Sequence, residues 1–139
     1  MPGVVKISEA ASLAIHAMVL MASHPAGRLS VKEIAATYQL SGAHLAKVLQ
    51  RLARNGLVES LRGPSGGFRL ARGASEITLL EIYEAMEDRL DRPGCLLSPD
   101  ICAGDACLLG QTIRQINDQV YRTFSDTSLS DLTQSISPK

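Results

Sequence analysis

The fold is decided by residues 30–72, which run SVKEIAATYQLSGAHLAKVLQRLARNGLVESLRGPSGGFRLAR. A helix is predicted to begin at Ser30, because Ser30 and Glu33 have the spacing of a capping box, in which each side chain bonds the backbone amide of the other. After a short break, Ser41 can cap a second helix. The apolar residues of this second helix recur at helical spacing and share one face: Leu45, Val48, Leu49 and Leu52. The stretch is therefore predicted to start with a helix-turn-helix unit.

The second half of the stretch predicts a β-hairpin. Gly56 suits the left-handed position that commonly ends a helix, and residues 57–61 and 68–70 have the composition of strands. The residues between these strands, RGPSGG at 62–67, form a glycine-rich loop. A helix-turn-helix followed by a hairpin is typical of the winged helix, whose usual function is to bind DNA. The predicted fold class is therefore mainly α with a small β-hairpin.

Charge is unevenly distributed along the chain. The 139 residues include 14 Lys and Arg and 14 Asp and Glu, so the net charge is zero. Residues 28–73, however, contain eight basic and two acidic residues, a net charge of +6 that the rest of the chain balances. A basic unit of this kind is typical of a surface that binds phosphate. We therefore predict double-stranded DNA as a partner.

The face of the second helix opposite the leucines carries the residues expected to contact DNA. The early residues of such a helix approach base edges, and the hairpin can contact the minor groove or the backbone. The predicted DNA interface comprises Ser41, Gly42, Ala43, His44, Lys47, Arg51 and Arg54 on the helix and Arg62, Ser65, Gly66 and Arg69 on the hairpin. The alternative is an ordinary solvated polar face, which the local excess of basic charge disfavours.

The residues outside this stretch predict further helices. Residues 8–23 are apolar on nearly all sides, which is typical of a helix buried in a core or against a second subunit. Thr78 and Glu81 have the spacing of another capping box. A long helix is predicted from Leu108, and Thr127 is predicted to cap a short final turn. The long helix carries a narrow apolar stripe of Leu109, Ile113, Ile116, Val120 and Phe124.

A long helix with a narrow apolar stripe, beyond a complete small domain, requires a partner helix. We therefore predict that residues 108–139 contain the dimerisation helix of a homodimer and a tail, with packing back on the same chain as the alternative. Residues 1–88 are predicted to form the winged helix-turn-helix DNA-binding domain. Residues 89–107, which proline and glycine interrupt, are predicted to form a loop between the two.

The sequence excludes several other classes of protein. No apolar run is long enough to span a bilayer, and the N-terminus does not resemble a signal peptide. We therefore expect a cytoplasmic protein without a membrane partner, in a compartment that disfavours structural disulfides. The sequence contains no recognisable nucleophile–base pair, and its glycine-rich loop lacks the strand-then-helix order of a phosphate-binding loop. An enzyme is therefore not predicted.

All three cysteines fall in or at the end of the predicted loop. Cys95, Cys102 and Cys107 follow the pattern C-x6-C-x4-C, and such a cluster indicates soft-metal ligation. The C-x-x-C spacing common in structural zinc sites is missing, which disfavours zinc, whereas an iron–sulfur cluster tolerates irregular loops. Reversible oxidation of the thiols is the alternative. The spacing alone does not decide between a cluster and a thiol switch.

The order of these elements resembles the Rrf-type winged-helix regulators, which include an iron–sulfur cluster regulator and a nitric-oxide-sensing repressor. The residues that carry the resemblance are LAKVL at 45–49, NGLV at 55–58, RGPSGGFRL at 62–70 and ITLLE at 77–81, followed by the three-cysteine loop. The resemblance implies a homodimer with crossed long helices and a [2Fe–2S] or [4Fe–4S] cluster held by the three cysteines. It also implies a transcriptional repressor whose affinity for a palindromic operator follows redox state, nitric oxide or iron supply.

The sequence departs from the family pattern around the fourth ligand. The cysteine spacing is six and four instead of the commoner five and five, Gly110 stands where the cluster regulator has a histidine, and Ser12 stands where the nitric-oxide sensor has an acidic residue. His16 matches a histidine of some redox-sensing relatives. We therefore predict His16 as the fourth ligand, reaching across the dimer, with Ser12, Glu9 and Asp105 as alternatives. The other possibilities are that His16 only packs at an interface, and that the regulator has no cluster and uses reversible cysteine oxidation.

Overall fold

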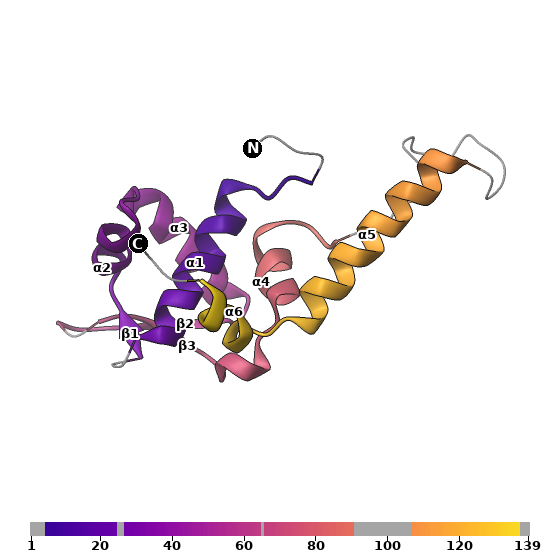
Figure 1. Cartoon of the computed structure of the whole chain (residues 1–139). Helices are drawn as coiled ribbons and strands as arrows, with labels where there is room; N and C mark the ends of the chain where they lie inside the picture. Colours follow the sequence, from indigo (N-terminus) through magenta and orange to yellow (C-terminus); the bar gives the residue numbers. More distant parts are fainter. Residues whose placement is uncertain (1–4, 25–26, 65, 91–106, 137–139) are drawn as a thin grey trace.

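The structure, a computed structural model, describes residues 5–24, 27–64, 66–90 and 107–136. The elements are α1 (Glu9–Ser23), β1 (Arg28–Leu29), α2 (Val31–Tyr38), α3 (Gly42–Arg54), β2 (Val58–Leu61), β3 (Gly67–Leu70), the 3-10 turn η1 (Ala74–Glu76), α4 (Leu79–Met86), α5 (Leu108–Asp126) and α6 (Leu129–Ser135). This arrangement of helices around a small antiparallel sheet confirms the predicted fold class (Figure 1). Four candidate site residues lie outside the described residues: Ser65, Cys95, Cys102 and Asp105.

Both capping signals of the helix-turn-helix are present. At the start of α2, the Ser30 hydroxyl accepts a hydrogen bond from the Glu33 amide at 3.1 Å, and the Ser30 amide donates to the Glu33 carboxylate at 2.8 Å. Gln39 ends α2 with a left-handed φ of 56°. The Ser41 hydroxyl accepts from the His44 amide and caps α3. The four apolar residues of α3 are buried, which leaves its opposite face for solvent or a ligand.

The predicted hairpin belongs to a three-stranded antiparallel sheet in the order β1-β3-β2. We call β2, β3 and their loop, residues 58–70, the wing. The strand β1 lies against β3 with the pairs Arg28–Arg69 and Leu29–Phe68. The sequence did not predict β1, because two residues are too few to show the alternation of a strand.

Two consecutive glycines allow the wing to lie close to its neighbours. A Cβ atom on Gly67 would stand 2.5 Å from the Leu29 carbonyl oxygen, and one on Gly66 would stand 2.7 Å from the Leu61 carbonyl oxygen. Gly67 also has a φ of 136°, which residues with a side chain rarely adopt. The glycines of this loop therefore satisfy a steric requirement of the sheet.

The core surrounds α1, which is buried along most of its length and packs against α3, α4 and α6. The last helix is part of this core, because Leu129 is fully buried. Two backbone hydrogen bonds fix the returning chain, from the Leu79 amide to the Thr127 carbonyl at 2.8 Å and from the Leu129 amide to the Ile77 carbonyl at 2.8 Å. The chain thus leaves the winged helix, passes through α5 and comes back to it.

The prediction that Thr127 caps the last helix is wrong. Ser128 is the cap: its hydroxyl accepts from the Asp131 amide at 3.1 Å, and its amide donates to the Asp131 carboxylate at 2.9 Å. The Thr127 hydroxyl instead donates to the Thr123 carbonyl at 2.6 Å, at the end of α5. A capping box with Asp131 at the third position outcompetes the hydroxyl one residue earlier.

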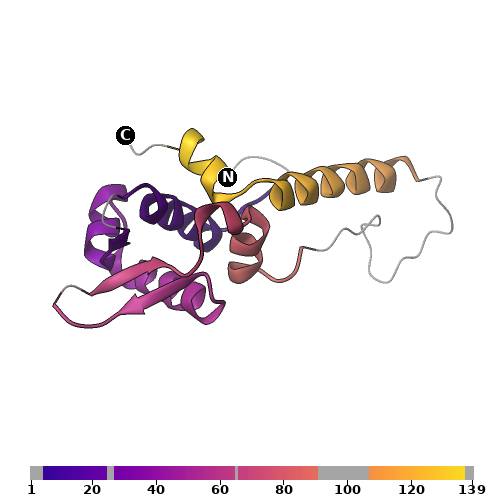
Figure 2. The ribbon, with the colours of Figure 1, turned by 90° about the horizontal axis from the view of Figure 1, so that it is seen from below.

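The long helix α5 projects from the helical body, as Figures 1 and 2 show from two directions. Its C-terminal half contacts α4, where the rings of Tyr83 and Phe124 meet edge to face with centroids 5.4 Å apart. Towards its other end, Leu108, Leu109 and Ile116 are 78%, 53% and 37% exposed. One part of the stripe therefore packs on its own chain and the other part does not. No helix in the described part of the chain is long and apolar enough to cross a membrane.

Arg72 connects the end of the wing to α4. Its guanidinium donates to the Glu81 carboxylate at 2.7 Å and to the Glu76 carbonyl at 3.3 Å. Burial alone would raise the pKa of Glu81, but hydrogen bonds from Thr78 and the ion pair with Arg72 outweigh burial and lower this pKa below its ordinary value. A carboxylate with a lowered pKa stabilises the fold above its unfolded-state pKa, and this stabilisation is lost as the pH falls through the folded-state pKa.

We expect Glu81→Gln to be less stable than the wild-type protein at pH 7 and equally stable at pH 3. Glutamine can retain the capping box with Thr78 through its amide oxygen, whereas its amide nitrogen cannot accept the Arg72 hydrogen bond, so the substitution removes the ion pair together with the charge. Because both partners of the ion pair are 40% exposed, the difference at pH 7 should be about 0.3–1 kcal/mol. Urea unfolding followed by circular dichroism at the two pH values measures it. A difference that persists at pH 3 would assign the effect to geometry instead of charge.

Candidate nucleic-acid interface and ligand residues

The outer face of α3 carries most of the predicted DNA interface. Lys47, Arg51 and Arg54 are exposed, on the side of the helix opposite the buried leucines. Ser41 and Ala43 are exposed at the N-terminal end, where Gly42 is half-buried. This end of a helix presents free backbone amides, which favour a nearby phosphate. The structure therefore places the predicted α3 residues together on one accessible, basic surface.

The wing adds a second basic surface. Arg62 is exposed at the start of the loop, and Gly66 lies within the loop. Arg69 is also exposed, but its Nε donates to the Glu59 carboxylate at 2.8 Å. Sequence reasoning missed Glu59 because its pairing depends on the register of the hairpin, in which Glu59 stands opposite Arg69. Counting outward from the loop would have revealed this pair once the ends of the strands were known.

The recognition helix α3 also meets α1. His44 Nδ1 lies 3.8 Å from a carboxylate oxygen of Glu9, between side chains that are 42% and 76% exposed. Glu9 is therefore directed towards α3, and the structure brings this alternative cluster ligand to the predicted DNA interface. The contact places the imidazole of His44 beside the first turn of α1.

His16, the predicted fourth ligand, has one ring nitrogen engaged. Its Nδ1 lies 2.7 Å from the Ser12 carbonyl oxygen, and a carbonyl can only accept, so Nδ1 carries the proton. In the neutral ring, Nε2 then keeps a lone pair for a ligand. The hydrogen bond to the Ser12 carbonyl orients the ring, as a hydrogen bond at the other ring nitrogen commonly orients a metal-binding histidine.

Tyr38 joins His16 to the helix-turn-helix. The two rings meet edge to face with centroids 5.5 Å apart, and the Tyr38 hydroxyl donates to the His16 carbonyl at 3.2 Å. Burial raises the pKa of Tyr38, which keeps this donor protonated. Tyr38 is the last residue of α2, so these contacts link His16 to the turn that leads to α3.

Cys107 is the described member of the cysteine cluster. It is exposed and caps α5, where its Sγ accepts a hydrogen bond from the Gly110 amide at 3.3 Å. The sulfur is therefore presented to solvent at the N-terminal end of a 19-residue helix. This chemistry suits both a soft metal and oxidation.

The structure does not bring Cys107 and His16 together within one chain. Cys107 is the N-cap of α5 and His16 lies within α1, and Figures 1 and 2 show the N-terminal end of α5 projecting away from the helical body that contains α1. Within the described ranges, no three His, Cys, Asp or Glu side chains are grouped to hold a metal ion. A site that contains both residues therefore needs a second copy of the chain.

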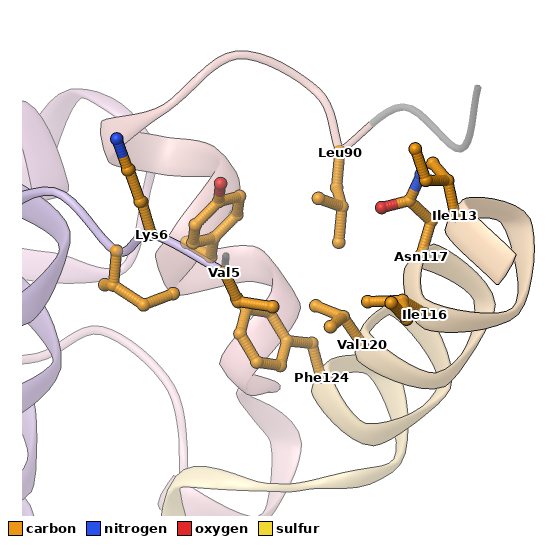
Figure 3. Close-up of a pocket in the computed structure, with 10 residues that line it drawn as sticks. Val5, Lys6, Leu90, Ile113, Ile116, Asn117, Val120 and Phe124 are labelled. Carbon is orange, nitrogen blue, oxygen red and sulfur yellow. The ribbon is translucent and has the colours of Figure 1, made fainter. Parts of the chain in front are cut away.

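A groove lies between α5, the segment after α4 and the N-terminal segment (Figure 3). Its volume is about 260 Å³, and its apolar lining includes Val5, Leu90, Ile113, Ile116, Val120 and Phe124. Four of these residues belong to the stripe that the sequence predicts on the long helix. The groove thus continues the exposed apolar surface of α5 towards the helical body.

Comparisons with known proteins agree with this architecture. The Rrf2 family, described as iron-dependent transcriptional regulators, matches residues 7–135. The transcriptional regulator IscR of Photorhabdus laumondii is 31% identical over 128 residues, which cover 91% of this chain and 78% of that protein. The structure of CymR, the global cysteine regulator of B. subtilis, has a TM-score of 0.78 and 29% identity, and covers 96% of this chain and 99% of its own. The structure of T. potens IscR has a TM-score of 0.76 at 24% identity, over 95% and 88% of the two chains, and shows the same fold.

Proposed function

The chain belongs to the Rrf2 family of transcriptional regulators, and we propose that it acts as a homodimer whose affinity for a palindromic operator is set by an iron–sulfur cluster. Its family and its relatives are transcriptional regulators, not enzymes. The observation that carries the proposal is the accessible basic face of α3 beside a basic wing, in a stretch of the chain with a net charge of +6. We propose that α3 enters the major groove and that the wing contacts the flanking backbone.

The proposed dimer is supported by the apolar surface that one chain leaves uncovered. Leu108, Leu109 and Ile116 are exposed along α5, next to the groove of Figure 3. We propose that α5 of a second copy covers this surface through a two-fold interface, in which the same patch serves both subunits. Two such subunits would present their α3 helices to half-sites about one helical turn of DNA apart.

The proposed cluster ligands are Cys95, Cys102 and Cys107 of one subunit and His16 of the partner subunit. The support from the described residues is chemical: Cys107 presents an exposed sulfur at the start of α5, and the hydrogen bond at Nδ1 of His16 leaves Nε2 for a ligand in the neutral ring. When bound, the cluster would supply a centre whose state depends on redox conditions, nitric oxide or iron supply. The carbonyl of Ser12 orients the His16 ring, while Glu9 is directed to α3 and Asp105 lies outside the described residues.

We propose that the state of the site reaches DNA through His16 and Tyr38. A ligand bond at His16 would restrain α1, and Tyr38 would pass this restraint to the turn between α2 and α3. The regulator would then populate two arrangements of its α3 helices that differ in operator affinity. A coupling on the order of 1–3 kcal/mol would change that affinity about 5- to 150-fold.

A second candidate function is a cluster-free regulator that senses oxidation of its cysteines. The structural similarity to Staphylococcus aureus CymR, which is 25% identical and has been solved in an oxidized form, favours this candidate, and so does the exposed thiol of Cys107 beside an amide donor. An exposed cysteine thiol is accessible to oxidants, and its first oxidation products are reversible. The two candidates share the DNA interface and differ in whether iron is bound.

We expect Cys107→Ala to abolish the visible absorption of protein purified without oxygen and to make operator affinity insensitive to oxidants and nitric oxide. The physical reason is that a cluster with one ligand removed is not retained, so the variant should bind operator as the iron-free protein does. Absorption spectra, iron and sulfide analysis and a gel shift on a palindromic operator measure these effects. Thr112→Ala, an exposed change one turn along α5, is the matched control and should behave as the wild type.

The outcomes separate the two candidates. Colourless, iron-free wild-type protein whose operator affinity still responds to oxidants would reject the cluster and support the thiol switch. A Cys107→Ala variant with full absorption would remove Cys107 from the ligand set. Wild-type protein that binds no duplex at low salt would reject the DNA interface itself.

A further inference from the structure

Glu59 is placed to compete with DNA for an arginine of the wing. Glu59 and Arg69 stand directly opposite each other on β2 and β3, and the Arg69 Nε donates to a Glu59 carboxylate oxygen at 2.8 Å. Their side chains are 48% and 54% exposed. The pair is therefore open to solvent, and a phosphate oxygen could replace the carboxylate at the guanidinium.

The surroundings of the pair are basic. Across the sheet, Arg28 of β1 is the partner of Arg69 in the register, so Arg28, Arg69 and Glu59 form one row across three strands. Residues 28–73 contain only one other acidic residue, Glu33, and its carboxylate accepts the Ser30 amide in the capping box of α2. Of the two acidic residues in this stretch, Glu59 is therefore the one whose carboxylate binds a side chain that is predicted to contact DNA.

The pair is not needed to hold the wing together. Exposed ion pairs, including those between opposite residues of two strands, contribute little to stability. The wing is instead held by four residue pairs along β2 and β3 and by the close approach of Gly67 to β1. We expect the charge of Glu59 to affect DNA affinity more than it affects stability. Each phosphate that a protein neutralises releases counterions, and this release makes binding depend on salt.

We propose that Glu59 is a built-in competitor for phosphate, which holds Arg69 in the free protein and lowers the affinity of the wing for any DNA duplex. This inference rests on the proposed contact between the wing and the DNA backbone. A phosphate contact carries no sequence information, so Glu59 lowers operator and non-operator affinity together. Its consequence is a lower overall affinity for DNA without a change in the preference for the operator.

The test is a set of affinities for an operator duplex and for a scrambled duplex, measured by fluorescence anisotropy between 50 and 300 mM KCl. We expect Glu59→Gln to raise both affinities by about 3- to 10-fold, to leave their ratio unchanged and to make the salt dependence steeper by about one counterion. Arg69→Gln should lower both affinities. Adding Glu59→Gln to Arg69→Gln should then have a much smaller effect than it has alone.

The control is Asp126→Asn, which removes one negative charge at the end of α5, away from the wing. An equal gain of affinity in this variant would overturn the proposal, because net charge alone would then explain the effect. Two other results would overturn the proposal. One is a Glu59→Gln variant whose DNA affinities are unchanged, and the other is a double variant in which Glu59→Gln still gives its full gain of affinity on top of Arg69→Gln. In all of these cases the wild-type protein still binds DNA and the proposed function stands, whereas a wild-type protein that binds neither duplex overturns both. Thermal melts check that each variant is folded.

Discussion

Replacing Gly67 by alanine is expected to lower the free energy of unfolding by about 2–5 kcal/mol, through strain and overpacking, and to remove most of the affinity for DNA. The added methyl group would stand 2.5 Å from the Leu29 carbonyl oxygen and 2.8 Å from its carbonyl carbon. These are backbone atoms, which cannot rotate away as a side chain can. The residue also has a φ of 136°, a region that is essentially restricted to glycine. To accommodate the methyl group, β3 must separate from β1 or change its backbone conformation.

Gly63→Ala is the matched control for this prediction. Gly63 lies in the same loop with a φ of 95°, but an added Cβ would meet no atom within 4 Å. The control therefore contains the conformational strain without the steric clash, and we expect its free energy of unfolding to fall by about 1–2 kcal/mol. Urea unfolding and a gel shift on the same duplex measure both variants. Equal losses in the two variants would mean that positive φ, and not contact with β1, makes glycine necessary at position 67.

The local elements of the fold could be predicted because their signals are short in range. The capping boxes at Ser30 and Thr78 and the cap at Ser41 depend only on residues three positions apart, and all three are present. The buried face of α3 follows from the spacing of its leucines. Where a signal was ambiguous by one residue, as at Thr127, the prediction chose the wrong cap, because only the structure shows which hydroxyl reaches an amide.

The features that could not be predicted depend on contacts between distant residues. The strand β1 exists only because Leu29 pairs with Phe68, and α6 joins the core only because the chain returns after α5. The same holds for the candidate site: the α3 face followed from its periodicity, whereas the hydrogen bonds from Arg69 to Glu59 and from Tyr38 to His16 cross between elements. Side-chain pairs of this kind have no signature along the sequence.

The apolar surface of α5 leads to the second prediction, in which Ile116→Asp converts the proposed dimer into monomers. Ile116 is 37% exposed and lines the groove between α5 and the helical body (Figure 3). A carboxylate that is buried without a partner costs about 2–3 kcal/mol at an interface. A two-fold interface contains the substitution twice, so we expect the dimer dissociation constant to rise by about 10³- to 10⁴-fold.

The operator affinity should fall with the dimer. Two linked α3 helices bind two half-sites far more tightly than one helix binds one half-site, and the loss of this linkage should reduce affinity about 10²- to 10⁴-fold. Analytical ultracentrifugation measures the mass, and fluorescence anisotropy with operator and half-operator duplexes measures the affinity. We expect Ile116→Asp to bind both duplexes with the same weak affinity, because a monomer uses only one half-site.

Gln115→Asp is the matched control, since it adds the same charge one position away at an exposed polar residue of α5. The helical rotation of about 100° between neighbours turns this side chain away from the apolar stripe, so the control should remain dimeric and keep its operator affinity. If Ile116→Asp also remains dimeric and folded, the subunits do not meet at this groove. His16 of one subunit would then have no route to Cys107 of the other along α5, and the proposed shared cluster would fail together with the proposed interface.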